Sequence, residues 1–139
     1  MSKRKEKVMQ LFEKRYSCSQ AVFLGYCDLF GIDKDTGLKI ASGFGGGIAG
    51  MGETCGAINS AVMLLGLKYG FTDTDDLEGR KKVKETIKSF INDFNEKHAK
   101  IYCRSLLTED EGKTHKIHSD KCFTLIEEVC DLLEKYLLK

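Results

Sequence analysis

Residues 43–66 read Gly43-Phe-Gly-Gly-Gly-Ile-Ala-Gly-Met-Gly-Glu-Thr-Cys55-Gly-Ala-Ile-Asn-Ser-Ala-Val-Met-Leu-Leu-Gly66. Six of the ten residues from 43 to 52 are glycine, and the segment after Cys55 is mostly apolar. Glycine permits positive φ angles and lets other groups approach the backbone closely. A simple turn needs only one or two glycines. The stretch therefore predicts a loop on which a small molecule or another helix packs directly, with Cys55 at its rim.

The composition is that of a folded globular domain. The chain has 139 residues, of which 42% are hydrophobic and 31% are charged. A chain of this length can bury a core without disulfides or metals, so we expect one domain over residues 1–139. The net charge of +1, from 22 basic and 21 acidic residues, indicates neither a nucleic-acid partner nor an anionic membrane.

The chain shows no targeting or membrane signal. Residues 1–15 are charged throughout and lack the apolar centre of a secretory signal. The longest apolar run, residues 61–67, is far too short to span a bilayer. We therefore expect a cytoplasmic protein, a compartment in which structural disulfides are rare. Six cysteines in such a chain indicate redox chemistry or metal binding.

Apolar spacing and capping residues predict an all-α fold, a compact bundle of about five or six helices. The chain has no proline, and strand-like alternation is hard to find. Three helices are predicted in the first part of the chain: one around Val8 to Phe12, one opened by a capping box of Ser17 and Gln20 and stopped by Gly31, and a brief one capped by Asp33 or Asp35. Three more follow: a central apolar one over about residues 55–68 capped by Thr54, a long one opened by Asp73 or Thr74, and a final one capped by Ser119. Residues 101–107 could add a short helix. Residues 108–118 are predicted as a polar loop, and His98 is expected on the exposed side of its helix.

Position along these helices divides the cysteines. Cys18, Cys55 and Cys122 fall in the first turn of a predicted helix, where free amide donors and the helix dipole favour a thiolate. Cys27 and Cys130 fall deeper, among apolar residues, and are predicted to be small buried hydrophobic side chains. The competing interpretation, that all six are inert core cysteines, fits three first-turn positions less well.

Cys103 has no clear cap before it, although Arg104 could stabilise a thiolate there. Spacing excludes disulfides within a helix, since Cys18 and Cys27 are about 13 Å apart and Cys122 and Cys130 about 12 Å apart along a helix. A disulfide needs Cα atoms within roughly 7 Å. Any dithiol pair must therefore join different segments.

The cysteine pattern resembles a known family. Its carriers are the run Gly50-Met-Gly-Glu-Thr-Cys55-Gly-Ala57, the earlier Tyr16-Ser-Cys18-Ser-Gln-Ala-Val22, and the later Cys103-Arg104 and Cys122. They resemble the small bacterial and archaeal redox-active proteins named for the pattern C_GCAxxG_C_C. The resemblance implies that Cys18, Cys55, Cys103 and Cys122 form the active set. Ser60 stands where the motif ends in glycine, and a small side chain still fits a close helix contact.

Thiol–disulfide exchange is the first functional hypothesis. Cys55 is predicted to be the nucleophile, because the glycine loop leaves it approachable and the helix start lowers its pKa. Cys18, Cys103 or Cys122 would resolve the mixed disulfide, and four cysteines allow three connectivities. Such an oxidoreductase would act on a thiol or disulfide partner protein or on a small-molecule electrophile. Its broadly apolar helices also allow a homodimer.

Metal binding by the same cysteines is the alternative. Thiolates of Cys18, Cys55, Cys103 and Cys122 converging from helix starts would suit zinc or an iron–sulfur cluster. A variant combines Cys103 and Cys122 with His115 and His118. The sequence has no close Cys-x2-4-Cys arm, which most such sites use, and ordinary loop histidines are the simpler interpretation of His115 and His118.

A nucleotide or phosphate site is the third hypothesis. Residues 45–50 match the pattern G-x-G-x-x-G, and the backbone of Gly45, Gly46, Gly47 and Gly52 could line a cofactor pocket. The pattern has meaning only between a strand and a helix, and no strand is predicted before it. The loop is better interpreted as a collar of low bulk around Cys55.

Overall fold

The computed structural model describes residues 2–108 and 118–138. Over these ranges the chain forms seven α-helices and two short 3₁₀ helices. They are α1 (Lys3–Glu13), α2 (Cys18–Tyr26), η1 (Cys27–Phe30), α3 (Lys34–Ala41), η2 (Ser42–Phe44), α4 (Gly56–Tyr69), α5 (Leu77–Asn95), α6 (Cys103–Leu107) and α7 (Asp120–Leu137). The all-α class is confirmed. The predicted number of five or six helices is too low, because the brief segments α3 and α6 both fold as separate α-helices.

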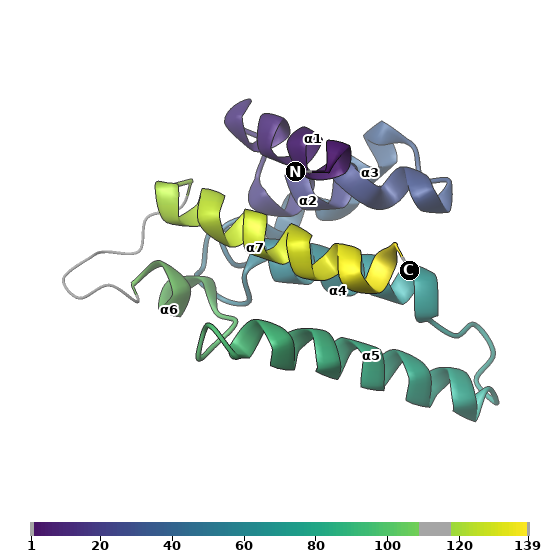
Figure 1. The fold of residues 1–139 in the computed structure, drawn as a ribbon. Coiled ribbons are helices and arrows are strands. Elements are labelled where there is room, and N and C mark those ends of the chain that lie inside the picture. The colour runs from purple at the N-terminus through teal and green to yellow at the C-terminus, as the bar shows by residue number, and fades with distance from the viewer. Residues whose placement is uncertain (1, 109–117, 139) are drawn as a thin grey trace.

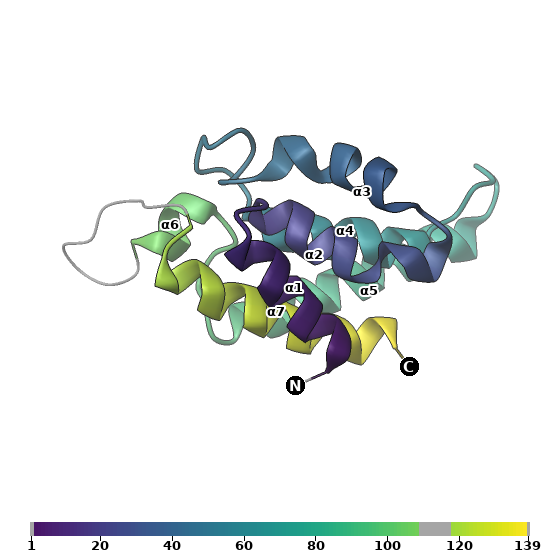
Figure 2. The same cartoon turned by 90° about the horizontal axis from the view of Figure 1, so that it is seen from above.

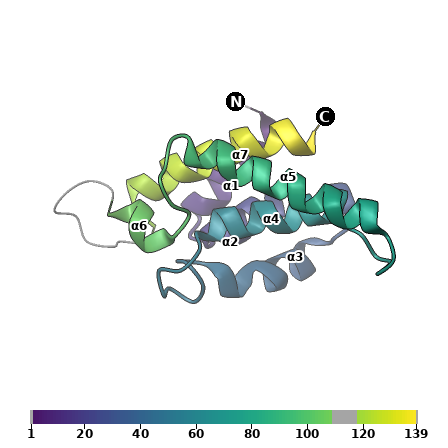
Figure 3. The same cartoon turned by 90° about the horizontal axis from the view of Figure 1, so that it is seen from below.

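Helix α4 lies at the centre and packs against α2, α5 and α7 (Figures 1 and 3). Its fully buried side chains are Ala57, Ile58, Ser60, Ala61, Leu64 and Leu65. Helices α1 and α3 both pack on α2, and α1 also contacts α7. None of the helices in the described ranges is long and apolar enough to cross a bilayer.

The first turns of α2, α4 and α7 lie at one end of the molecule, together with α6 and the glycine loop (Figure 2). The two chain ends lie away from it. Because each of these helix starts carries a cysteine, the topology brings together residues that are far apart in sequence.

Two of the predicted caps are confirmed. The Ser17 hydroxyl accepts a hydrogen bond from the Gln20 amide, and the Gln20 side chain accepts one from the Ser17 amide, both at 3.2 Å. This capping box starts α2 one residue before Cys18. Asp33 caps α3 by accepting from the Thr36 amide at 3.1 Å.

Other predicted caps are wrong or incomplete. Cys55, not Thr54, is the N-cap of α4, because Thr54 pairs in an isolated antiparallel bridge with Tyr102. Asp76, rather than Asp73 or Thr74, caps α5. Ser119 is the N-cap of α7 but makes no capping hydrogen bond to a backbone amide.

The glycine loop before α4 forms a left-handed turn. Residues 46–50 all have positive φ, including Ile48 at 62° and Ala49 at 50°. The turn is closed by backbone hydrogen bonds from Ala49 to Gly43 at 2.9 Å and from Gly52 to Gly46 at 3.1 Å. Positive φ is costly for a β-branched residue such as Ile48, so the surrounding contacts must hold this conformation.

Other segments do pack directly on the glycines, as the sequence predicts. A Cβ atom on Gly47 would lie 2.7 Å from the Cβ of Cys103, and one on Gly56 would lie 2.6 Å from the Sγ of Cys18. Real Cβ atoms do not make contacts this short. The bare backbone at these two positions therefore lets Cys103 and Cys18 approach Cys55.

Backbone hydrogen bonds join the loop to α6. The Cys55 amide donates to the Ile101 carbonyl at 2.8 Å, and the Cys103 amide donates to the Glu53 carbonyl at 2.6 Å. Since these bonds flank both cysteines, they fix Cys55 and Cys103 relative to each other without side-chain contacts.

Ser60 joins α4 to the start of α2. Its hydroxyl donates to the Ser19 carbonyl at 2.6 Å, and the Ser19 hydroxyl donates to the Ala41 carbonyl at 2.7 Å. Both serines are fully buried. A small side chain at the position of the motif's glycine is thus accommodated, and it adds a buried hydrogen bond beside Cys18.

The prediction of an exposed His98 is wrong. Its side chain is 6% exposed, stacks on Phe94, and pairs with Glu128 of α7 at 2.6 Å. The helix periodicity could not reveal this, because Glu128 is a tertiary partner.

Substituting Gly56 tests the close approach of α2 to α4. We expect Gly56→Ala to lower the free energy of unfolding by about 1–3 kcal/mol through overpacking. Gly66→Ala is the matched control in the same helix, where an added Cβ meets nothing within 4 Å; it should stabilise the chain by about 0.5–1 kcal/mol. Urea unfolding of both variants measures the difference, and equal effects would contradict the assigned role of Gly56.

Candidate functional site

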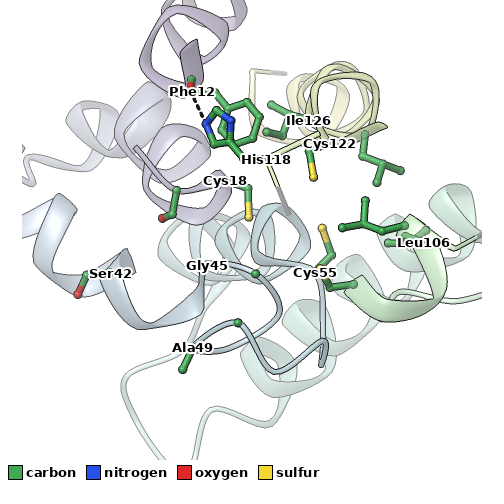
Figure 4. Close-up of a pocket in the computed structure, with 16 residues that line it drawn as sticks. Phe12, Cys18, Ser42, Gly45, Ala49, Cys55, Leu106, His118, Cys122 and Ile126 are labelled. Atoms are coloured by element: carbon green, nitrogen blue, oxygen red, sulfur yellow. Dashed lines mark hydrogen bonds between the residues drawn. The ribbon is translucent and has the colours of Figure 1, made fainter. Parts of the chain in front are cut away.

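A cavity of about 400 Å³ lies where the helix starts meet. Four cysteines line it: Cys18, Cys55, Cys103 and Cys122. Figure 4 shows the sulfurs of Cys18, Cys55 and Cys122 around this space. Cys27 and Cys130 do not line it. The structure therefore brings together the four cysteines of the family pattern and separates them from the other two.

Each of the four cysteines stands at the beginning of a helix. Cys18 is the first residue of α2, Cys103 the first of α6, and Cys122 the third of α7. The first-turn prediction is confirmed for Cys18 and Cys122. Cys55 is one residue outside its helix, at the N-cap. The short helix predicted within residues 101–107 is present as α6, but its start at Cys103 was not predicted, because Tyr102 caps it without a side-chain hydrogen bond.

The rest of the wall is largely apolar. Large apolar side chains come from α1, α6 and α7: Phe12, Leu106, Leu107, Leu125 and Ile126. No Lys, Arg, Asp or Glu belongs to the wall within residues 2–108 and 118–138. Arg104, which could have stabilised a thiolate at Cys103, instead donates to the Met51 carbonyl at 2.9 Å.

His118 is the histidine of the wall. Its ring stacks on Phe12 with centroids 3.9 Å apart, and Nε2 lies 2.8 Å from the Phe12 carbonyl oxygen (Figure 4). A carbonyl only accepts, so Nε2 carries a proton. In the neutral ring Nδ1 is then an acceptor.

Burial controls the ionisation of the inner cysteines. Cys55 is 7% exposed and Cys103 is 6% exposed. Burial, together with the neighbouring thiolates of Cys18 and Cys103, raises the pKa of Cys55 to about 12. Burial likewise raises the pKa of Cys103 to about 12. The prediction of a lowered pKa at Cys55 is therefore wrong, and Cys55 is buried beside the cavity rather than exposed at a rim.

Magnitudes explain this outcome. A helix start stabilises an anion by about 0.3–1 kcal/mol, and by up to about 2 kcal/mol in favourable sites. A rise in the pKa of Cys55 from 9.0 to about 12 corresponds to about 4 kcal/mol against the thiolate. Desolvation thus outweighs the helix start.

Cys18 is subject to both effects. Burial raises its pKa, while hydrogen bonds from the backbone amides of Gly46, Ser19 and Ala57 act in the opposite direction. The Ala57 amide also favours the thiolate of Cys55. Two thiols thus share one donor at the start of α4, the Ala57 amide.

The four thiols form two layers. Cys55 and Cys103 are buried, whereas Cys18 and Cys122 are partly exposed. At the outer layer the Ser119 hydroxyl donates to the Cys122 sulfur at 3.7 Å. A molecule entering from solvent meets Cys122 and Cys18 first.

Cys27 and Cys130 are core residues, as the sequence predicts. They are 1% and 0% exposed. Cys27 donates to the Ile32 carbonyl at 3.6 Å, and burial raises the pKa of Cys130 to about 12.

The glycines considered for cofactor binding divide into two pairs. Gly45 and Gly46 line the cavity. Gly47 packs on Cys103, and Gly52 packs on Arg104, so the chain itself occupies the space beside them. The backbone before them is helical, which removes the strand that a dinucleotide loop requires.

All six cysteines are free thiols. Within the described residues, no group of three or more His, Cys, Asp or Glu side chains is arranged to hold a metal ion. His115, part of the mixed metal hypothesis, lies outside these residues.

Phe12 and His118 were missed as a pair by the sequence interpretation. His118 directly precedes the predicted cap Ser119 and stands four residues before Cys122, which is a weak local indication. Its contact with Phe12 crosses 106 positions of sequence. Local sequence patterns cannot predict a contact between residues so far apart in sequence.

The raised pKa of Cys55 predicts a pH dependence of stability. The folded chain keeps a thiol proton that the unfolded chain loses above pH 9, because the pKa is about 12 when folded and 9.0 ordinarily. The free energy of unfolding should therefore fall from pH 9 towards 12, by up to about 1.4 kcal/mol per pH unit for this thiol. Urea unfolding at several pH values should give Cys55→Ala a shallower slope; identical slopes would contradict the burial effect.

The two layers predict an order of alkylation. With iodoacetamide at pH 8, Cys122 should react first, and Cys55 and Cys103 at least about 100-fold more slowly, since their thiolates are scarce. Mass spectrometry of peptides measures each rate. In urea, where the layers are lost, the six rates should converge. Faster reaction of Cys55 than of Cys122 in the folded chain would refute the layering.

Comparison with known proteins identifies the family of this chain. Residues 16–136 match the family described as "Putative redox-active protein (C_GCAxxG_C_C)". The chain belongs to this family. No curated protein and no solved structure matches it.

Proposed function

We propose that this family member is a thiol–disulfide redox protein whose cavity cysteines cycle between thiols and a disulfide. One observation carries the proposal: the four cysteines of the family pattern line one cavity, and the two remaining cysteines do not. A purely structural role would not require four thiols around an open space.

Cys122 is the attacking thiol in this proposal. It is partly exposed, and it lies in the first turn of the 18-residue helix α7. The Ser119 hydroxyl donates to its sulfur at 3.7 Å. His118 lines the same cavity, and its Nδ1 is the candidate acceptor of the Cys122 proton.

The first step is attack of the Cys122 thiolate on one sulfur of a substrate disulfide. A new S–S bond forms to Cys122, the substrate S–S bond breaks, and the leaving thiolate takes a proton. The product is a mixed disulfide at the outer layer of the cavity.

Cys18 is the resolving thiol. The Cys122 thiolate is one of the groups that raise the pKa of Cys18, so capping Cys122 in a mixed disulfide removes that repulsion. The Cys18 thiolate, held by three backbone amides, then attacks the Cys122 sulfur and expels the second substrate thiolate. Overall, two cysteine thiols are oxidised and one substrate disulfide is reduced to two thiols.

Cys55 and Cys103, the two buried cysteines of the cavity, can receive the disulfide by exchange later in the same cycle. Cys55 stands beside Cys18 at the start of α4 and shares the Ala57 amide with it. Attack of Cys55 on the Cys18 sulfur of a Cys18–Cys122 disulfide would free Cys122 and move the disulfide inward. The high pKa of Cys55 makes this exchange slow at neutral pH.

Thiol counting tests the function. The chain, purified without oxygen, is analysed for zinc and iron and then titrated with diamide. We expect loss of about two thiols per equivalent of oxidant, recovery with dithiothreitol, and disulfide peptides that contain only the cavity cysteines. One zinc or iron bound per chain would favour the metal alternative instead. Thiols that never oxidise reversibly would refute the redox function.

Matched cysteine variants assign the roles. Cys122→Ser should abolish the mixed disulfide with a small disulfide, whereas Cys18→Ser should trap it. Cys27→Ser is the control, because Cys27 is buried away from the cavity; it should lower stability and leave the redox titration unchanged. A trapped adduct on Cys55 in the Cys18→Ser variant would overturn the order of attack.

A further inference from the structure

We infer that the substrate is a small, uncharged disulfide with apolar substituents, which enters the cavity itself. This inference rests on the redox function proposed above. It concerns which disulfides reach the thiols, and it follows from the volume, the wall and the depth of the cavity.

The cavity has the size and the surface of a small-molecule site. Its volume of about 400 Å³ lies in the range of ligand pockets in proteins, about 300–1,000 Å³. Phe12, Leu106, Leu107 and Ile126 form much of its wall. Burial of aliphatic substituents against these side chains is the available source of binding energy.

The described part of the wall carries no acidic or basic side chain other than His118. None of the described wall residues is Lys, Arg, Asp or Glu. Arg104 directly follows the wall residue Cys103 in sequence. Its guanidinium group donates a hydrogen bond to the loop carbonyl of Met51. An ammonium or carboxylate group would lose its hydration on entry without meeting a Lys, Arg, Asp or Glu among the described wall residues, which is costly.

The reduced thiols keep the cavity itself nearly uncharged. The pKa values of Cys55 and Cys103 are raised to about 12, so both are neutral at physiological pH. A neutral ligand therefore meets neither repulsion nor a desolvated anion at the inner layer.

The burial of the inner cysteines distinguishes small disulfide substrates from protein disulfides. The sulfurs of Cys55 and Cys103 belong to residues less than 8% exposed, so a disulfide on a protein surface can touch only the outer layer. A small disulfide can lie among all four thiols. Direct contact between the substrate and the inner thiols therefore requires a ligand that enters the cavity.

A charge series of small disulfides tests the inference on the reduced full-length chain. The probes are bis(2-hydroxyethyl) disulfide, which is neutral, cystamine, which carries two positive charges, and dithiodipropionate, which carries two negative charges. Glutathione disulfide and insulin serve as a large charged and a protein disulfide. Each rate of cavity oxidation is divided by the rate of the same probe with free dithiothreitol, which removes intrinsic reactivity.

We expect the normalised rate of the neutral probe to exceed those of both charged probes by at least about tenfold, given the cost of burying an unpaired charge. Diethyl disulfide, which is more apolar, should react at least as fast as the hydroxyethyl probe. Equal normalised rates across the series, or a faster reaction with insulin or glutathione disulfide, would overturn the inference.

Charge variants at the rim provide a second readout. Ser42 lines the cavity and is exposed. Ser42→Glu should raise the rate of cystamine relative to dithiodipropionate severalfold, and Ser42→Lys should reverse this ratio. Ser89→Glu and Ser89→Lys are the matched controls, since Ser89 is exposed on α5 and away from the cavity; they should leave the ratio unchanged. If the ratio of the cystamine rate to the dithiodipropionate rate were the same with Glu as with Lys in place of Ser42, entry through this cavity would be contradicted.

The two levels of proposal fail differently. If diamide oxidises the cavity thiols reversibly but the neutral disulfides do not react preferentially, the substrate inference fails and the redox function stands. If neither diamide nor any disulfide oxidises them, the redox function itself fails.

Discussion

The site depends on the close approach of two cysteine-bearing segments to bare backbone around Cys55. Cys18 contacts Gly56 and Cys103 contacts Gly47, at distances that leave no room for a Cβ atom. Backbone hydrogen bonds between residues 52–55 and 101–104 hold the second of these contacts. Without these approaches, the cysteines would lie at separate helix starts and no common cavity would form. The glycine loop is therefore a packing surface for the other segments of the site.

Gathering the thiols has an electrostatic consequence that opposes the effect of the helix starts. Each cysteine stands where amide donors favour an anion, yet burial raises the pKa of Cys18, Cys55 and Cys103. Thiolates in one cavity also repel each other. At most one thiolate is easily accommodated at a time, which suits a stepwise exchange that begins at the outer layer. In the reduced chain the thiols of Cys55 and Cys103 are thus protonated at neutral pH.

Prediction from sequence succeeded where the deciding interactions are local. The capping box of Ser17 and the cap of Asp33 connect residues three positions apart, and the structure contains both. Prediction failed where a residue interacts with a segment that is distant in sequence. Thr54 is taken by the bridge to Tyr102, so the cap moves to Cys55. His98 is buried by its pair with Glu128, 30 positions away.

The sequence by itself determined the all-α class, the first-turn positions of Cys18 and Cys122 and the burial of Cys27 and Cys130, and its resemblance to the family implied the set of four cysteines. These follow from apolar periodicity, local capping and motif spacing, which act within a few residues. Only the tertiary structure decided that the four thiols share one apolar cavity, that Cys55 lies inside rather than at the rim, and that its pKa rises. Burial is the physical reason, because desolvation depends on which distant segments cover a residue, and α1, α6 and α7 provide that cover here.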